Sequence, residues 1–198
     1  MKKVHLLLFA AILFFASCGN ESENKVTHLP YQLEEDGRWG LIDWEGNPLI
    51  EEEFENRPSV VINGHFCVEN SDGLYEIYTA EKKPIQIGEE YLSVGYFVND
   101  LAPVVKKDSY ISYINTKGEE VFKLTKYWDT PIIEAWPYGD NELAKVKTST
   151  EKYGYINTKG EFVIPPTYQY IDSGTNGIYL AKISDNKYLY INKREKLL

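Results

Sequence analysis

Short segments in which apolar and polar residues alternate recur along the chain from about residue 30 onward. The segments at 39–43 and 153–157 follow the two-residue period of a strand with one buried face. No stretch of the chain shows the longer period of an extended amphipathic helix. Turn-forming residues follow each alternating segment, as in Asp43-Trp44-Glu45-Gly46. The pattern predicts an all-β fold.

An internal repeat organises these segments. Tyr-Ile-Asn-Thr-Lys-Gly-Glu occurs at 113–119 and again, without change, at 155–161. Aligning the chain on this match gives five units, which open at Trp39, Tyr75, Ile111, Tyr153 and Tyr188, with spacings of 36, 36, 42 and 35 residues. Within a unit, Asn-Thr-Lys-Gly predicts a tight hairpin in which Gly118 or Gly160 supplies a positive φ.

Each unit reads as a three-stranded antiparallel meander. One strand precedes the hairpin, at 65–68, 101–104, 143–146 and 180–183, and Tyr31–Glu34 occupies the corresponding place in the first unit. Residues 187–196 supply the last hairpin. A single meander buries only one face, so the units must stack, and the later aromatics Phe54, Tyr91, Tyr127 and Tyr168 are expected to fill the seams. We favour an open superhelical array over a closed β-propeller, because propeller blades usually have four strands.

The motif resembles the WG repeat, in which Trp-Gly-hydrophobic-Ile-Asp/Asn precedes a glycine, a hydrophobic pair and a later aromatic. The first unit carries Trp39, Gly40 and Gly46, and the fourth carries Tyr153, Gly154 and Gly160. The other units are degenerate, with Tyr75-Glu76 in the second. The resemblance covers about residues 30–196 and implies a structural role for the aromatic–glycine pair. No common activity is attached to the repeat.

The first residues have the features of a cleavable signal. Two lysines precede a short apolar run at 4–16, and Phe-Ala-Ser-Cys at 15–18 resembles the lipobox of bacterial lipoproteins. The sequence therefore predicts a signal peptide at 1–17, acylation of Cys18, a polar tether at 18–28 and a WG-repeat-like β domain at 29–198. The sequence also predicts an extracytoplasmic protein. Gly19 stands where an aspartate would favour retention in the inner membrane, so anchoring in the outer membrane is expected.

Net charge and cysteine content limit which ligands and which cross-links the chain can have. Removal of residues 1–17 takes away two lysines and no acid, which leaves 19 basic and 30 acidic residues and a net charge of −11. Non-specific nucleic-acid binding is therefore disfavoured. Cys67 is the remaining thiol after Cys18, so no intramolecular disulfide is expected and stability must come from packing.

Candidate chemistry is sparse. His65 and Cys67 lie two residues apart on one predicted strand and could form a thiol–base pair, but no third residue is placed to orient the imidazole. Metal-binding spacings and phosphate-binding glycine loops are absent, and the acidic runs at 34–36, 51–53 and 89–90 lack the pattern of a calcium loop. We therefore expect no catalytic residues, no metal and no cofactor.

Aromatic residues outside the repeat pattern are the better candidates for a binding surface. Trp128, Trp136 and Tyr138 lie in the extra length between the third and fourth units, at 127–141, and Trp44 lies in the first hairpin. Insertions in repeat proteins map to loops that often form the binding face. The sequence favours a non-enzymatic envelope lipoprotein that binds a protein or glycan. An envelope glycan hydrolase and a purely architectural component are the alternatives.

Overall fold

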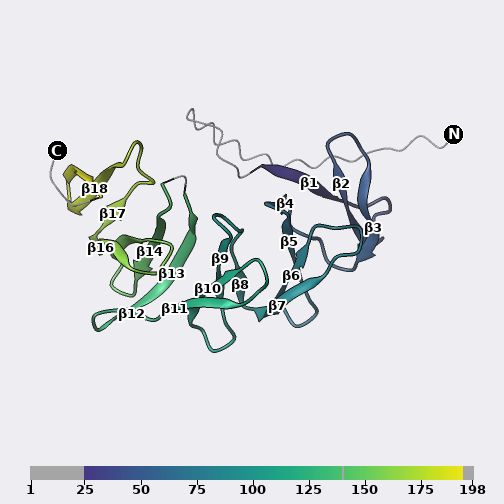
Figure 1. Ribbon diagram of the computed structural model, residues 1–198, viewed down its shortest axis with the longest axis horizontal. Helices are drawn as coiled ribbons and strands as arrows, with labels where there is room; N and C mark the ends of the chain where they lie inside the picture. Colours follow the sequence, from purple (N-terminus) through teal and green to yellow (C-terminus); the bar gives the residue numbers. More distant parts are fainter. Residues whose placement is uncertain (1–24, 140, 194–198) are drawn as a thin grey trace.

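A computed structural model describes residues 25–139 and 141–193 of the chain. The predicted signal peptide and Cys18 lie outside the described residues. The chain forms β-strands joined by turns, and five units follow one another along an open arc (Figure 1). The all-β prediction and the open array are confirmed. None of the described residues forms a helix long and apolar enough to cross a bilayer.

The strands group into the five units that the repeat defines. Unit 1 contains β1 (Val26–Tyr31), β2 (Trp39–Asp43) and β3 (Pro48–Phe54), and unit 2 contains β4 (Val61–Ile62), β5 (His65–Glu69), β6 (Tyr75–Thr79) and β7 (Gln86–Tyr91). Unit 3 contains β8 (Ser93–Val94), β9 (Leu101–Val105), β10 (Ile111–Asn115) and β11 (Glu120–Leu124). Unit 4 contains β12 (Lys126–Tyr127), β13 (Thr130–Tyr138), β14 (Ala144–Thr148), β15 (Tyr153–Ile156) and β16 (Phe162–Tyr168), and unit 5 contains β17 (Tyr170–Ile171), β18 (Ile178–Ser184) and β19 (Lys187–Asn192).

Units 1 to 4 each contain a meander of three antiparallel strands, and units 2, 3 and 4 place further strands in front of it. In unit 5 the front strand β17 is followed by β18 and β19, and the hairpin predicted at 187–196 continues beyond the described residues. In units 2 and 3 the further strand is one strand of only two residues, β4 or β8, and in unit 4 there are two, β12 and β13. Four strands in a unit are therefore compatible with an open array, and the strand number was the wrong reason to favour one. β4 also pairs with β1, which joins units 1 and 2 into one seven-stranded sheet.

The first strand begins earlier than the sequence pattern indicated. β1 starts at Val26, so residues 26–28 of the predicted tether belong to the sheet, and the strand ends at Tyr31 instead of running from Tyr31 to Glu34. The register explains the difference, because His28 pairs with Asp43 on one side and with Val61 on the other. Backbone pairing on both sides thus holds residues 26–28 in an extended conformation.

Hydrophobic side chains of the described residues pack in the seams between successive units. Four clusters occupy the four seams, and each draws residues from both neighbours. Tyr91 and Tyr168 are buried in their seams, and Phe54 and Tyr127 pack against theirs while partly exposed, which confirms the predicted role of these aromatics. The fold is stabilised unit against unit, as expected for a repeat array.

The hairpin turns follow the predicted chemistry. Gly160 adopts a φ of +79°, and its N–H donates to the carbonyl of Asn157 at 2.9 Å. The side-chain oxygen of Asn157 accepts from the N–H groups of Lys159 and Glu161, each at 3.0 Å. Gly46 and Gly118 adopt φ values of +89° and +80° in the equivalent turns. Asparagine or aspartate thus closes the turn while glycine takes the left-handed position.

The glycine of the aromatic–glycine pair faces a bulged strand. Tyr153 pairs with Tyr168 and Tyr155 with Ile164, so β16 spans four residue steps where β15 spans two. The extra backbone of β16 passes over Gly154, where an added Cβ would lie 2.4 Å from the Ile164 carbonyl oxygen. Gly40 faces the same bulge in β3, 2.5 Å from the Ile50 oxygen by the same measure. The pair is therefore a structural device, as the sequence indicated.

Candidate functional site

The four aromatic residues that the sequence put forward for a binding surface lie in different environments. Trp128 is 80 % exposed at the turn between β12 and β13, and Trp44 is 65 % exposed in the turn between β2 and β3, where its indole N–H donates to the Val26 carbonyl at 3.0 Å. Trp136 is half-buried on β13. Among the described residues, no ring contact joins Trp44, Trp128 and Trp136 to one another.

Tyr138 is not available to a partner. Its side chain is 1 % exposed within the seam between units 3 and 4, where its ring lies 5.2 Å from the ring of Tyr113. Its hydroxyl donates to the Asn157 carbonyl at 2.9 Å. The prediction that Tyr138 contacts a partner is therefore wrong, because β13 turns this residue into the core.

The extra length between units 3 and 4 is a hairpin, not a loop. β12 and β13 pair through Tyr127 and Thr130, and β13, which is nine residues long, pairs with β14 from Ile132 to Tyr138. The expected binding loop is thus an ordered strand that presents Trp136 on one face. Trp128 at the hairpin tip has a φ of +53°, a conformation that glycine and asparagine adopt with less strain than tryptophan.

Trp136 forms part of a compact group with Lys145, Lys147 and Tyr153, which we name the unit 4 aromatic cluster. The ring centroids of Trp136 and Tyr153 lie 6.3 Å apart. The Lys145 ammonium lies 5.1 Å from the Trp136 centroid and 6.0 Å from that of Tyr153, and Lys147 lies 5.7 Å from Tyr153. Strand alternation produces the group, since Lys145 and Lys147 share one face of β14 while Ala144 and Val146 enter the core.

The two lysines of the cluster differ in their electrostatic partners. Lys147 forms ion pairs with Glu151 at 2.7 Å and Glu134 at 3.0 Å, and its hydrogen bonds to these carboxylates raise its pKa. Lys145 has no ion pair within the described residues, and burial lowers its pKa. Its cation lies near two aromatic rings, and the negative charge of Asp172 opposes the effect of burial on its pKa. Lys145 is therefore the group of the cluster that a ligand's acceptor oxygen can reach without displacing a carboxylate.

A similar arrangement recurs in unit 5. Lys182 pairs with Tyr170 and Tyr188 on its two neighbouring strands, and its ammonium lies 6.0 Å from the Tyr188 ring centroid. Lys182 differs from Lys145 in lying 3.3 Å from the carboxylate of Asp185. Neither lysine was among the residues predicted from the sequence. The signal was the recurrence of Leu-Ala-Lys at 143–145 and 180–182, where a lysine stands one residue beyond a core alanine.

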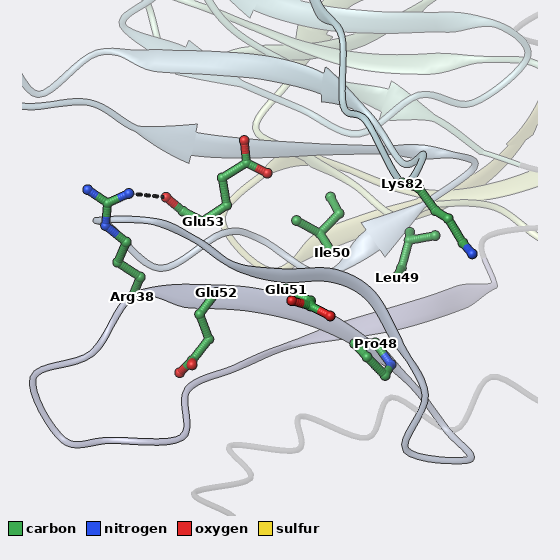
Figure 2. Close-up of a pocket in the computed structure, with 8 residues that line it drawn as sticks. All are labelled: Arg38, Pro48, Leu49, Ile50, Glu51, Glu52, Glu53 and Lys82. Atoms are coloured by element: carbon green, nitrogen blue, oxygen red, sulfur yellow. Dashed lines mark hydrogen bonds between the residues drawn. The ribbon is translucent and has the colours of Figure 1, made fainter.

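A pocket lies beside β3 (Figure 2). It has a volume of about 460 Å³ and is lined by charged side chains, with Lys82 reaching it from the turn between β6 and β7. Arg38 donates to the Glu53 carbonyl at 3.4 Å and pairs with Glu55 at 3.5 Å. Glu52 accepts the Leu33 N–H at 2.8 Å. No aromatic ring lines the pocket, so it offers no stacking surface, and its charged groups serve the local structure of an edge strand.

His65 and Cys67 are the residues that were considered for catalysis. His65 Nδ1 lies 2.8 Å from the Asn63 carbonyl, and its ring lies 4.3 Å from that of Phe97. Burial raises the pKa of the Cys67 thiol, which disfavours the thiolate that a nucleophile requires. Within residues 25–139 and 141–193, no group of three or more histidine, cysteine, aspartate or glutamate side chains is placed to hold a metal ion.

Comparison with known families identifies the fourth unit. Residues 153–188 match the family described as WG containing repeat. The resemblance drawn from Tyr153, Gly154 and Gly160 is thereby confirmed for this part of the chain. The WG containing repeat begins at the opening residue of the fourth unit and ends at that of the fifth. No curated protein matches the chain.

Solved structures offer distant likenesses. The computationally designed Ika8 protein has 10 % identity and a TM-score of 0.48, covering 80 % of this chain and 53 % of its own. HIRA(644-1017) has 14 % identity and a TM-score of 0.43, covering 68 % and 50 %. BamB from Moraxella catarrhalis has 13 % identity and a TM-score of 0.42, covering 84 % and 54 %. The chain spans about half the length of each of these structures.

Proposed function

We propose that this chain is a non-enzymatic binding module of the cell envelope, anchored by acyl groups on Cys18, and that its unit 4 aromatic cluster contacts a glycan with acidic groups. The observation that carries the proposal is the Lys145 cation, which lies near the rings of Trp136 and Tyr153 and forms no ion pair within the described residues, although the charge of Asp172 acts on it. Aromatic faces pack against the apolar faces of sugars, and an ammonium group forms strong hydrogen bonds with a carboxylate.

A glycan suits the cluster better than a protein does. Protein interfaces usually bury at least about 1,000 Å² around a central, well-packed anchor. Trp136, Lys145 and Tyr153 are each half-buried, so none of them is a fully exposed anchor. A sugar ring can lie on the aromatic rings while its acidic group reaches Lys145. The net charge of −11 predicted for the processed chain would repel an acidic ligand. Binding of such a ligand would therefore depend on a local cation such as Lys145.

Binding of isolated cell-wall glycan tests the site. The parent full-length chain should sediment with the glycan, and Trp136→Ala and Lys145→Met should each lower the bound fraction at least tenfold. Trp44→Ala is the matched control, because Trp44 is an exposed tryptophan of another unit. Circular dichroism and thermal unfolding of each variant show whether it is folded. Equal binding by all four proteins would refute the cluster as the site, and failure of the parent to sediment with the glycan would refute the ligand class.

The anchor has its own test. Cells that express the full-length chain are labelled with radioactive palmitate, and the membranes are fractionated. The parent protein should carry the label. The Cys18→Ser variant should carry none and should no longer be found in the membrane fraction. Label that persists in the variant, or membrane retention without label, would contradict the proposed lipid anchor. Recovery of the labelled parent in the inner membrane would contradict the outer-membrane location alone.

A further inference from the structure

Unit 5 has a face that no other unit of the described residues covers. Ile191 is buried in the seam with unit 4 and Leu189 packs against it, so strand alternation turns Tyr188 and Tyr190 to the opposite side of β19. These two side chains are 55 % and 56 % exposed. We define the outer face of unit 5 by the residues that share this side: Tyr170, Ile178, Leu180, Lys182, Tyr188 and Tyr190.

The position equivalent to Tyr190 is buried in units 3 and 4. Tyr-Leu-Tyr-Ile-Asn at 188–192 aligns with Tyr-Gly-Tyr-Ile-Asn at 153–157, so Tyr190 corresponds to Tyr155 and, in unit 3, to Tyr113. Tyr155 is 3 % exposed and Tyr113 is 0 % exposed. Each also donates its hydroxyl hydrogen bond to a carbonyl of the following unit, Tyr155 to Asp172 and Tyr113 to Trp136 at 2.7 Å. Tyr190 has the same residue type at the same position without a following unit among the described residues.

The opposite end of the array carries the other half of such a seam. Leu41 lies in the seam between units 1 and 2, and Ile42, the next residue of β2, faces away from it. Leu29 pairs with Ile42, and Tyr31 shares their side of β1. In units 3 and 4 the residues that correspond to Ile42 are Ile114 and Ile156, both 0 % exposed against the preceding unit. Unit 1 therefore presents the kind of face that, in units 3 and 4, packs against the preceding unit. Among the described residues, no unit of the same chain packs against it.

We propose that the outer face of unit 5 binds unit 1 of a second copy of this chain, continuing the array across a molecular boundary. The contact repeats the seam that joins units within the chain. Charge favours this pairing, because residues 25–57 contain nine acidic and three basic side chains, whereas residues 170–193 contain two acidic and three basic. Such a head-to-tail interface is heterologous, so it forms a filament or a ring and not a symmetric dimer. The inference does not rest on the glycan proposal.

Photo-cross-linking in the full-length chain identifies the occupant. With Tyr190→p-benzoylphenylalanine, irradiation should give a product of twice the monomer mass, and its cross-linked peptide should map to residues 26–43 of the second copy. Cross-links to unit 5 of the second copy would show a symmetric contact. Cross-links to residues 194–198 of the same chain, or to another protein, would show a different occupant. Each of these results, or the absence of any cross-link, would overturn the proposal.

Sedimentation provides a second readout. The apparent mass of the full-length chain in detergent should rise with protein concentration, and Tyr188→Ser with Tyr190→Ser should weaken this association at least tenfold. Trp128→Ser is the control, because it removes an exposed aromatic ring from a different face. Raising the salt concentration should also weaken the association, since the charges of the two ends are screened. Equal association by the parent and the double variant would refute the outer face of unit 5 as the interface.

Discussion

Replacing Gly154 by alanine tests the structural account of the aromatic–glycine pair. The new Cβ would lie 2.4 Å from the Ile164 oxygen, 2.6 Å from the Pro166 nitrogen and 2.8 Å from the Pro165 carbonyl carbon. All three are backbone atoms of the bulge in β16, and the proline rings restrict how that backbone can shift. β16 must therefore move as a whole, away from the seam in which Ile164 is buried.

The size of the effect follows from two opposing contributions. Overpacking a well-packed site costs about 1–3 kcal/mol, and contact with backbone atoms places Gly154→Ala near the upper limit. Alanine also reduces the entropy of the unfolded chain, which returns about 0.4–1 kcal/mol. We expect the free energy of unfolding to fall by about 2 kcal/mol, and Gly40→Ala to behave alike because its Cβ would lie 2.5 Å from the Ile50 oxygen.

Urea unfolding of the full-length variants measures this change. Circular dichroism and tryptophan fluorescence should be followed together, because repeat arrays can unfold in more than one step. Gly139→Ala is the control: its nearest neighbour would be the Asn141 side-chain oxygen at 3.4 Å, so its stability should stay within about 0.5 kcal/mol of the parent. If Gly154→Ala is as stable as Gly139→Ala, the bulge does not explain the glycine.

Three further outcomes follow from the buried tyrosines and the strained turn. Tyr155→Phe should lower the free energy of unfolding by about 1–3 kcal/mol because it leaves a carbonyl of unit 5 without its donor, whereas Tyr190→Phe should change it little, as urea titration will show. Burial raises the pKa of Tyr113, Tyr138 and Tyr155, so stability should be complete below pH 10 and fall as pH rises above it, by about 1.4 kcal/mol per pH unit for each such group; a flat profile of unfolding free energy between pH 10 and 11 would contradict this. Trp128→Gly should keep or raise the melting temperature because glycine relieves a φ of +53°, and a clear fall would show that the tryptophan ring stabilises the hairpin.

The repeat motif made much of the fold predictable. A verbatim match fixed the hairpin turns through Asn115 and Asn157, and the opening aromatics located the seams. The two-residue strands β4, β8, β12 and β17 were missed, because two residues are too few to show a period. A tertiary register decided the start of β1.

The candidate site was harder to predict than the fold. Trp136 was selected, but Tyr138 was misplaced because the register of β13 shifts between Ala135 and Tyr138, and a bulge of this kind changes which face a side chain occupies. Lys145 was overlooked because its position varies among the units. Its importance comes from two rings contributed by neighbouring strands, a relation that only the folded structure contains.

The two ends of the open array should differ in local stability. Each end unit has one seam instead of two, but unit 1 also shares a continuous sheet with unit 2 through the pairing of β1 with β4, whereas unit 5 forms a sheet of three strands on its own. Backbone hydrogen bonds across a unit boundary must break before unit 1 can open, so we expect unit 5 to open first.

Hydrogen exchange of the dilute full-length chain should show faster exchange in β18 and β19 than in β1 and β2. Tyr188→Ser with Tyr190→Ser removes the proposed contact between copies, so if β19 of the parent becomes protected at high concentration while the variant's does not, the protection comes from a second copy. Slower exchange in unit 5 than in unit 1 at low concentration would show that the seam between units 4 and 5 alone outweighs the shared sheet.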